Sequence, residues 1–140
     1  MKVNSSQDNA LESPGSVIEI ADSYSAIADS LHHVLNRWPG QFAVSTEKAY
    51  ALLTEEYGLR VRLGILRSDA ANRTVIGVNV NHAEFVDLLE RTARIIKNAD
   101  TVEQVAYLVN SVSVLCLSTF PGKHETVNFL IQRLRTDIHY

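Results

Sequence analysis

The stretch LRVRLGILRSDAANRTVIGVNVN, from Leu59 to Asn81, contains two runs in which apolar and polar residues alternate. Alternation with a period of two is typical of a strand with one buried face. The segment between the runs, residues 68–73, is rich in turn-forming residues. The stretch therefore predicts a β-hairpin around which the rest of the chain packs. The alternating apolar residues are Val61, Leu63 and Ile65 in the first strand and Ile76, Val78 and Val80 in the second.

The register of this hairpin is restricted because a slip of one residue turns a strand over. Both apolar rows share a face when Ile65 pairs with Ile76, and Gly64 then lies opposite Gly77 on the other face. Glycine weakens a strand and often marks the close approach of another backbone. Either a helix of the same chain or a binding partner is expected to fill this notch. The predicted binding face carries Arg60, Arg62, Gly64, Gly77, Asn79 and Asn81.

The arginines of this face suggest an anionic ligand or an acidic protein segment, because guanidinium groups pair well with carboxylates and phosphates. The alternative is that the chain's own acids, for instance Asp22 or Asp29, neutralise them. The stretch is a basic island in a chain whose net charge is −3. An acidic chain is a poor candidate for non-specific nucleic-acid binding, which depends on many phosphate contacts.

The composition is that of a globular protein of one domain, with 140 residues of which 46% are hydrophobic. No apolar run is long enough to cross a bilayer, and the polar N-terminus lacks a signal-peptide core. The single cysteine, Cys116, excludes an internal disulfide and suits a reducing compartment. We therefore expect a cytoplasmic protein, with residues 1–15 as a disordered leader and residues 16–140 as one domain.

A helix from Ser16 to Trp38 carries an apolar seam with alternating spacings of three and four. Ser16 and Glu19 predict a capping box at its start, and Pro39 ends it. A seam of this spacing could pair with the same helix in a second subunit, so we expect a homodimer, most simply two-fold. The alternative is packing on helices of the same chain. The seam consists of Val17, Ile20, Tyr24, Ile27, Leu31, Val34 and Trp38.

Four further helices complete the predicted architecture. The second is capped by Ser45 or Thr46 and ends at Tyr57, where Gly58 suits a helix terminus. Asn81 with Glu84 caps the third helix, Asp100 or Thr101 opens the fourth, and the last begins near His124. Residues 111–118 could alternatively form a strand. The predicted fold class is α+β, with about five helices around a small antiparallel hairpin in the order α-α-β-β-α-α-α.

Catalytic, metal and cofactor signals are absent from the sequence. No paired cysteines, no His-Glu-x-x-His and no phosphate loop occur, and Cys116 lies in an apolar setting that makes a thiol inert. We therefore expect a small non-catalytic protein that binds another protein, as an adaptor, regulator, secretion chaperone or toxin-neutralising partner. The alternative is a small-ligand or anion-binding protein, or a small enzyme, with its site on the outer face of the hairpin.

Overall fold

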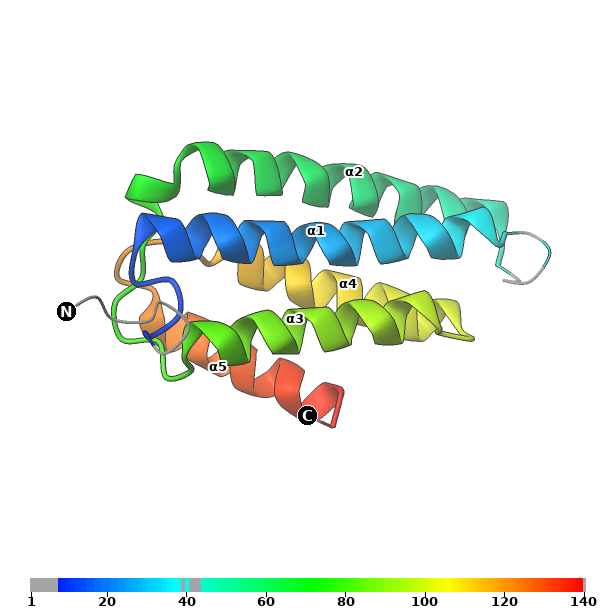
Figure 1. Cartoon of the computed structure of the whole chain (residues 1–140). Coiled ribbons are helices and arrows are strands. Elements are labelled where there is room, and N and C mark those ends of the chain that lie inside the picture. Colours follow the sequence, from blue (N-terminus) through cyan, green and yellow to red (C-terminus); the bar gives the residue numbers. More distant parts are fainter. Residues whose placement is uncertain (1–7, 39, 41–43, 140) are drawn as a thin grey trace.

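The computed structural model describes residues 8–38, 40 and 44–139, and this part of the chain consists of five α-helices with a short 3-10 helix. The helices form an elongated bundle (Figure 1). In chain order the elements are α1 (Pro14–Asn36), α2 (Thr46–Ser68), η2 (Ala70–Asn72), α3 (His82–Lys97), α4 (Val102–Leu117) and α5 (His124–Asp137).

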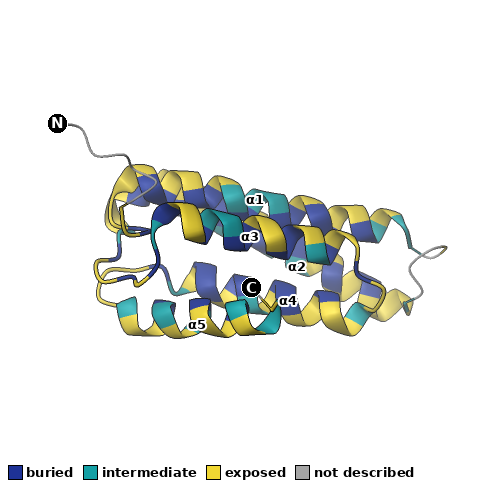
Figure 2. Cartoon of the chain, turned by 60° about the horizontal axis from the view of Figure 1, so that its bottom comes forward, coloured by how far each residue is buried: buried dark blue, intermediate teal, exposed yellow. Residues whose placement is uncertain are grey.

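Helix α1 is the centre of the bundle and makes its most extensive contacts with α2 and α3, while α4 packs on α2 and on α5. Tyr24 of α1 and Phe85 of α3 meet edge to face with their ring centroids 6.3 Å apart, an arrangement that aromatic pairs favour. The buried residues lie on the helix faces that are turned toward one another, and the exposed residues lie on the outer faces (Figure 2).

The predicted β-hairpin and the α+β fold class are wrong. Residues 59–68 continue α2, and within the described residues the only β-type pairing is an isolated antiparallel bridge between Asn9 and Asn81. A helix turns by about 100° per residue, so residues two positions apart lie on nearly opposite faces. Leu63 is buried whereas Val61 and Ile65 are exposed. The alternation thus comes from a helix with apolar residues on two faces.

The second predicted strand is an irregular segment whose backbone is paired with the N-terminal residues. Val75 N–H donates to Leu11 O at 2.7 Å and Ala10 N–H to Val80 O at 2.9 Å. Ala10 and Leu11 are fully buried, so the part of the expected disordered leader that begins at Asp8 is packed against the bundle. Residues 1–7 lie outside the described residues. Segment 8–11 thus takes the place beside residues 75–82 that the hairpin prediction gave to residues 60–66.

The helix starts agree with the sequence at most caps. Ser45, Asn81 and Thr101 accept hydrogen bonds from the backbone of α2, α3 and α4, and Asn81 forms the predicted capping box with Glu84. α5 begins at His124, as predicted. Residues 111–117 belong to α4, so the strand alternative for this region is wrong. Gly58 does not end α2, because residues 59–68 extend the helix by the packing of Leu59, Leu63 and Leu66.

The start of α1 differs from the prediction. The N-cap is Ser13, whose side chain accepts from the Ser16 N–H at 3.1 Å, and Pro14 occupies the first turn, where its missing N–H costs nothing. Ser16 is therefore inside the helix, where its Oγ contacts the Leu11 N–H and His82.

The α1 seam is buried within the chain. The first six residues of the seam, those before Trp38, have no exposed surface, because α2 and α3 cover them. Trp38 is partly buried and its Nε1 donates to Val44 O at 2.7 Å. The seam thus packs on helices of the same chain, as the alternative interpretation expects. It has no free surface for a second subunit.

Candidate interaction surface

Helix α2 has an inner and an outer apolar face. Its inner face packs into the core through Leu52, Leu59, Leu63 and Leu66. Five large apolar residues lie on the outer face, at spacings of three, four, four and four, and all of them are exposed. At about 100° per residue they span roughly a third of the helix circumference. We call this set the outer stripe, and it consists of Tyr50, Leu53, Tyr57, Val61 and Ile65.

The two tyrosines dominate the outer stripe, with 70% of Tyr50 and 73% of Tyr57 exposed. They leave roughly 300 Å² uncovered, since an aromatic side chain has about 150–250 Å² of surface. The three aliphatic residues are about half exposed and raise the total to about 500 Å², which is the size of the largest apolar patch on a typical monomer and often marks a binding site.

Polar groups beside the outer stripe are already paired within the chain. Arg60 donates to Glu56 and to Asp29 at 3.0 Å each. Arg67 donates to Asp22 at 2.7 Å. The alternative in which Asp22 and Asp29 neutralise the arginines therefore describes Arg60 and Arg67. These pairs fix one edge of α2 to α1 and leave the outer stripe without a competing charge on that side.

Besides the exposed Tyr57 itself, the polar side chain near the centre of the outer stripe is that of Thr54. The Thr54 hydroxyl donates to Tyr50 O at 3.0 Å within the helix. Gly64 lies between Val61 and Ile65 along the same face, and a Cβ placed on it would meet no atom within 4 Å. The stripe thus has a bare stretch of backbone near its C-terminal end.

The six residues predicted as a binding face lie in separate parts of the structure. Arg60, Arg62 and Gly64 belong to α2. Arg62 lies against Gly58, and its Nη1 is buried without a hydrogen bond among the described residues. Gly77 has a φ of +98° and lies against the His124 ring, with its Cβ position 3.2 Å from Cγ. This is the internal packing that the sequence left as an alternative.

The asparagines of the predicted face have local structural roles. Asn79 N–H donates to Asn128 Oδ1 at 2.8 Å, and the Asn128 amide donates in turn to Gly77 O at 2.9 Å. Asn81 caps α3. The structure thus ties these residues to α3 and α5, and does not bring them together with Arg60 and Arg62 on the single face that the hairpin required.

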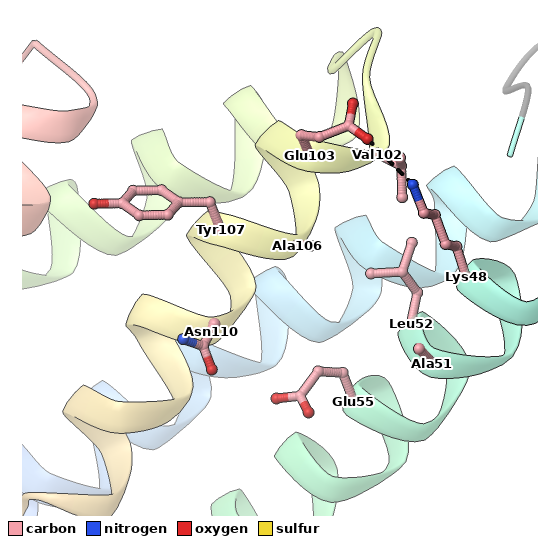
Figure 3. A pocket seen from close by; sticks show the side chains of 9 residues that line it. All are labelled: Lys48, Ala51, Leu52, Glu55, Val102, Glu103, Ala106, Tyr107 and Asn110. Atoms are coloured by element: carbon pink, nitrogen blue, oxygen red, sulfur yellow. Dashed lines mark ion pairs between the residues drawn. The ribbon is translucent and has the colours of Figure 1, made fainter.

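A groove of about 550 Å³ lies between α2 and α4 (Figure 3). Lys48 and Glu103 approach each other across it at 3.6 Å. Glu55 accepts from Ser113 Oγ at 3.2 Å, and Tyr107 points away from α2, with its hydroxyl oxygen 3.3 Å from Arg133 Nη2. Ligand sites usually hold a few convergent polar groups, whereas the charged groups here already have partners in the chain and Tyr107 faces elsewhere.

One constellation resembles a catalytic triad. Ser16 Oγ lies 2.7 Å from His82 Nδ1, and His82 Nε2 lies 2.7 Å from Glu19 Oε2. A serine nucleophile needs access to substrate, but Ser16 is buried and its Oγ also accepts from the Leu11 N–H at 2.9 Å. We interpret the group as a structural set of hydrogen bonds that joins segment 8–11, α1 and α3. The sequence gives no signal for it, because Ser16 and His82 are 66 positions apart.

Cys116 is buried in the core, and burial raises the pKa of its thiol to about 11. The reactive species of cysteine is the thiolate, so this thiol is unreactive near neutral pH. No group of three or more histidine, cysteine, aspartate or glutamate residues in the described part of the chain could hold a metal ion. None of the described helices is long and apolar enough to cross a membrane.

Comparison with known proteins adds no assignment: no family model matches the chain, and no match was found among curated proteins or solved structures. Function is therefore inferred from the geometry of this chain. Sequence reasoning missed the outer stripe because it ended the second helix at Tyr57. The available signal was the helical spacing that continues from Tyr50 through Tyr57 to Ile65.

Proposed function

We propose that this protein is a small, non-catalytic cytoplasmic protein that binds another polypeptide chain through the outer stripe of α2. The observation that carries the proposal is the exposure of five large apolar residues in one line on one helix. Apolar patches of this size on a folded protein often mark interaction sites. The roles that remain open to such a protein are those of an adaptor, a regulator, a secretion chaperone or a toxin-neutralising partner.

The local chemistry favours a partner with an apolar helix rather than an acidic segment. Arg60 and Arg67 already have carboxylate partners on α1 and α2, so an acidic ligand would have to displace them. An amphipathic helix laid along α2 would instead cover the stripe with residues spaced at three and four. Because α2 is held to α1 and α4 on its inner side, binding would not require the surface to become ordered first.

Photo-cross-linking from the outer stripe tests the proposal. A photoreactive phenylalanine analogue is placed at Tyr57 in the full chain, in the cells that make the protein, and in a second version at Phe129. Phe129 of α5 is the matched control because it is also an aromatic residue, 63% exposed, away from the stripe. We expect one dominant adduct with a polypeptide from position 57 and none from position 129.

A charged neighbour in the labelled chain tests whether the cross-link is specific. Val61→Lys in the chain that carries the photoreactive residue should abolish the adduct from position 57, because a charge within an apolar contact prevents binding. Equal labelling from positions 57 and 129, or no adduct from position 57, would overturn the proposed function.

A further inference from the structure

We infer that the polypeptide bound at the outer stripe is a second copy of this chain, and that two α2 helices pair antiparallel about a two-fold axis at Tyr57. The inference rests on the proposed function, since it names the partner of the same surface. It also moves the expected homodimer contact from the buried seam of α1 to α2.

Tyr57 is the middle residue of α2 (Thr46–Ser68), and the outer stripe other than Ile65, taken together with Gly64, is arranged symmetrically about it. Leu53 and Val61 lie four residues to either side of it, and Tyr50 and Gly64 lie seven residues to either side. A two-fold axis perpendicular to the paired helices brings residues at equal and opposite offsets together. Leu53 then meets Val61 of the second copy, and the two Tyr57 side chains meet each other.

The pair that lies seven residues from the axis is matched in size. Antiparallel pairing places Tyr50, a large and exposed residue, over Gly64 of the second copy, where no atom lies within 4 Å of the Cβ position. Parallel pairing would instead set Tyr50 against Tyr50 and leave a gap between two glycines. Helix interfaces pack at high density when large side chains fill such holes, so the geometry favours the antiparallel arrangement.

The charges permit the same arrangement. The five residues of the outer stripe are uncharged, and Arg60 and Arg67 at its edge are neutralised by Asp29, Glu56 and Asp22. Glu47 lies at the N-terminal end of α2. In an antiparallel pair the two copies of Glu47 are about 30 Å apart, from a rise of about 1.5 Å per residue, whereas parallel pairing would place them side by side.

The area is sufficient for a specific but weak dimer. Covering about 500 Å² of the outer stripe on each copy removes roughly 1,000 Å² in total, which is the lower limit for a biological interface. Such contacts are commonly reversible in the micromolar range. The expected behaviour is therefore a monomer–dimer equilibrium that depends on protein concentration.

Sedimentation equilibrium of the full chain tests the pairing. The wild type should dimerise with a micromolar dissociation constant, Tyr57→Glu should weaken dimerisation at least about thirtyfold as expected for a central hot-spot residue, and Phe129→Glu should leave it unchanged. If Tyr57→Glu fails to fold by circular dichroism, Val61→Lys takes its place. A wild-type monomer at several hundred micromolar, or equal losses in Tyr57→Glu and Phe129→Glu, would overturn the inference.

Cysteine cross-linking tests the direction of the helices. Under mild oxidation Tyr57→Cys should form a disulfide with its own copy, and a mixture of Tyr50→Cys with Gly64→Cys should form the mixed dimer. Neither Tyr50→Cys nor Gly64→Cys alone should cross-link, and Phe129→Cys is the exposed control. The native Cys116 does not interfere because it is buried. A disulfide between two Tyr50→Cys chains would overturn the antiparallel arrangement.

Failure of this inference is distinguishable from failure of the proposed function. If the chain is monomeric while position 57 still cross-links to a different polypeptide, the second-copy inference is wrong and the proposed function stands. If position 57 yields no adduct with any polypeptide, both are wrong.

Discussion

Helices α1 and α2 have the same length, 23 residues each, but they bury their apolar residues in different ways. The apolar residues of α1 concentrate on the sides covered by α2 and α3, and Ile18 is the one large apolar residue of this helix that is exposed. Those of α2 occupy two opposite faces, and only the inner face is covered. The apolar residues of α1 thus mainly form the core, whereas α2 also has a row of apolar residues that the core does not bury.

The comparison also shows how a regular pattern can mislead in opposite directions. The regular seam of α1 suggested an intermolecular contact, yet the chain's own helices cover it. The alternation of Val61, Leu63 and Ile65 suggested a strand, yet it belongs to α2, which has more exposed large apolar residues than any other described helix. The seam of α1 is thus used up within the chain, whereas the outer face of α2 remains uncovered.

The largest expected effect comes from truncating one aliphatic residue in each helix. Ile27→Ala in α1 should lower the free energy of unfolding by about 2–5 kcal/mol, because it leaves a cavity in the core. Val61→Ala in the outer stripe of α2 should change it by no more than about 0.5 kcal/mol. Urea denaturation measures both. Similar losses in the two variants would contradict the distinction between covered and uncovered faces.

A smaller effect separates the first turns of the two helices. Ser16→Ala should cost about 1–3 kcal/mol, because it leaves the buried Leu11 N–H without its acceptor and His82 without one of its partners. Ser45→Ala at the start of α2 removes only an N-cap, which is worth about 0.5–2 kcal/mol. Thermal and chemical denaturation of both variants should give the larger loss for Ser16→Ala. The reverse order would mean that the Ser16–His82–Glu19 contacts contribute little.

Alanine substitutions at two glycines test the corrected secondary structure, in which Gly64 lies in α2 and Gly77 lies outside it. Gly64→Ala should raise the free energy of unfolding by about 0.5–1 kcal/mol, because alanine is the better helix former and the site is open. Gly77→Ala should lower it by about 1 kcal/mol, because its φ is +98° and the new methyl group would press on His124. The measurement belongs at low protein concentration, where dimerisation does not contribute. A hairpin with opposed glycines would predict the same sign for both.

The smallest effect is expected when the hydroxyl group is removed from a buried tyrosine of α1 and, for comparison, from an exposed tyrosine of α2. Tyr24 is fully buried and its hydroxyl has no hydrogen-bond partner among the described residues, and burial raises the pKa of this hydroxyl well above its ordinary value. Tyr24→Phe should therefore stabilise the protein by about 1 kcal/mol, since it removes an unpaired buried polar group. Tyr57→Phe should leave stability unchanged because that side chain is exposed. A loss of stability in Tyr24→Phe would indicate a partner for its hydroxyl.

The sequence predicts well what is decided locally. Ser45, Asn81 and Thr101 are caps because a short polar side chain next to a helix can satisfy a free backbone N–H wherever that helix packs. The buried residues of α1 and α3 follow from their helical spacing in the same way. These features depend on neighbours within one or two turns, and the structure confirms them.

The features that the sequence could not predict depend on distant contacts. Gly58 suited a helix terminus and Gly64 a strand, but the packing of Leu59, Leu63 and Leu66 outweighs the low helix propensity of both glycines. The candidate site followed the same error, because Arg60 and Asn81 could share a face only in the hairpin. Ala10 and Leu11 gave no signal, because two apolar residues in a polar run do not indicate what will cover them.

The pairing of segment 8–11 with residues 75–82 has a consequence for the order of events during synthesis. Val80 follows Ala10, its hydrogen-bond partner, by 70 residues. At about 5–20 residues per second, the ribosome needs roughly 4–14 s to add the residues between them. Helices α1 and α2 are complete before that point, whereas the segment that closes over the first turn of α1 still lacks its backbone partners in residues 75–82. Docking of the N-terminal segment is therefore a late step, and it is delayed by translation rather than by the search for the contact.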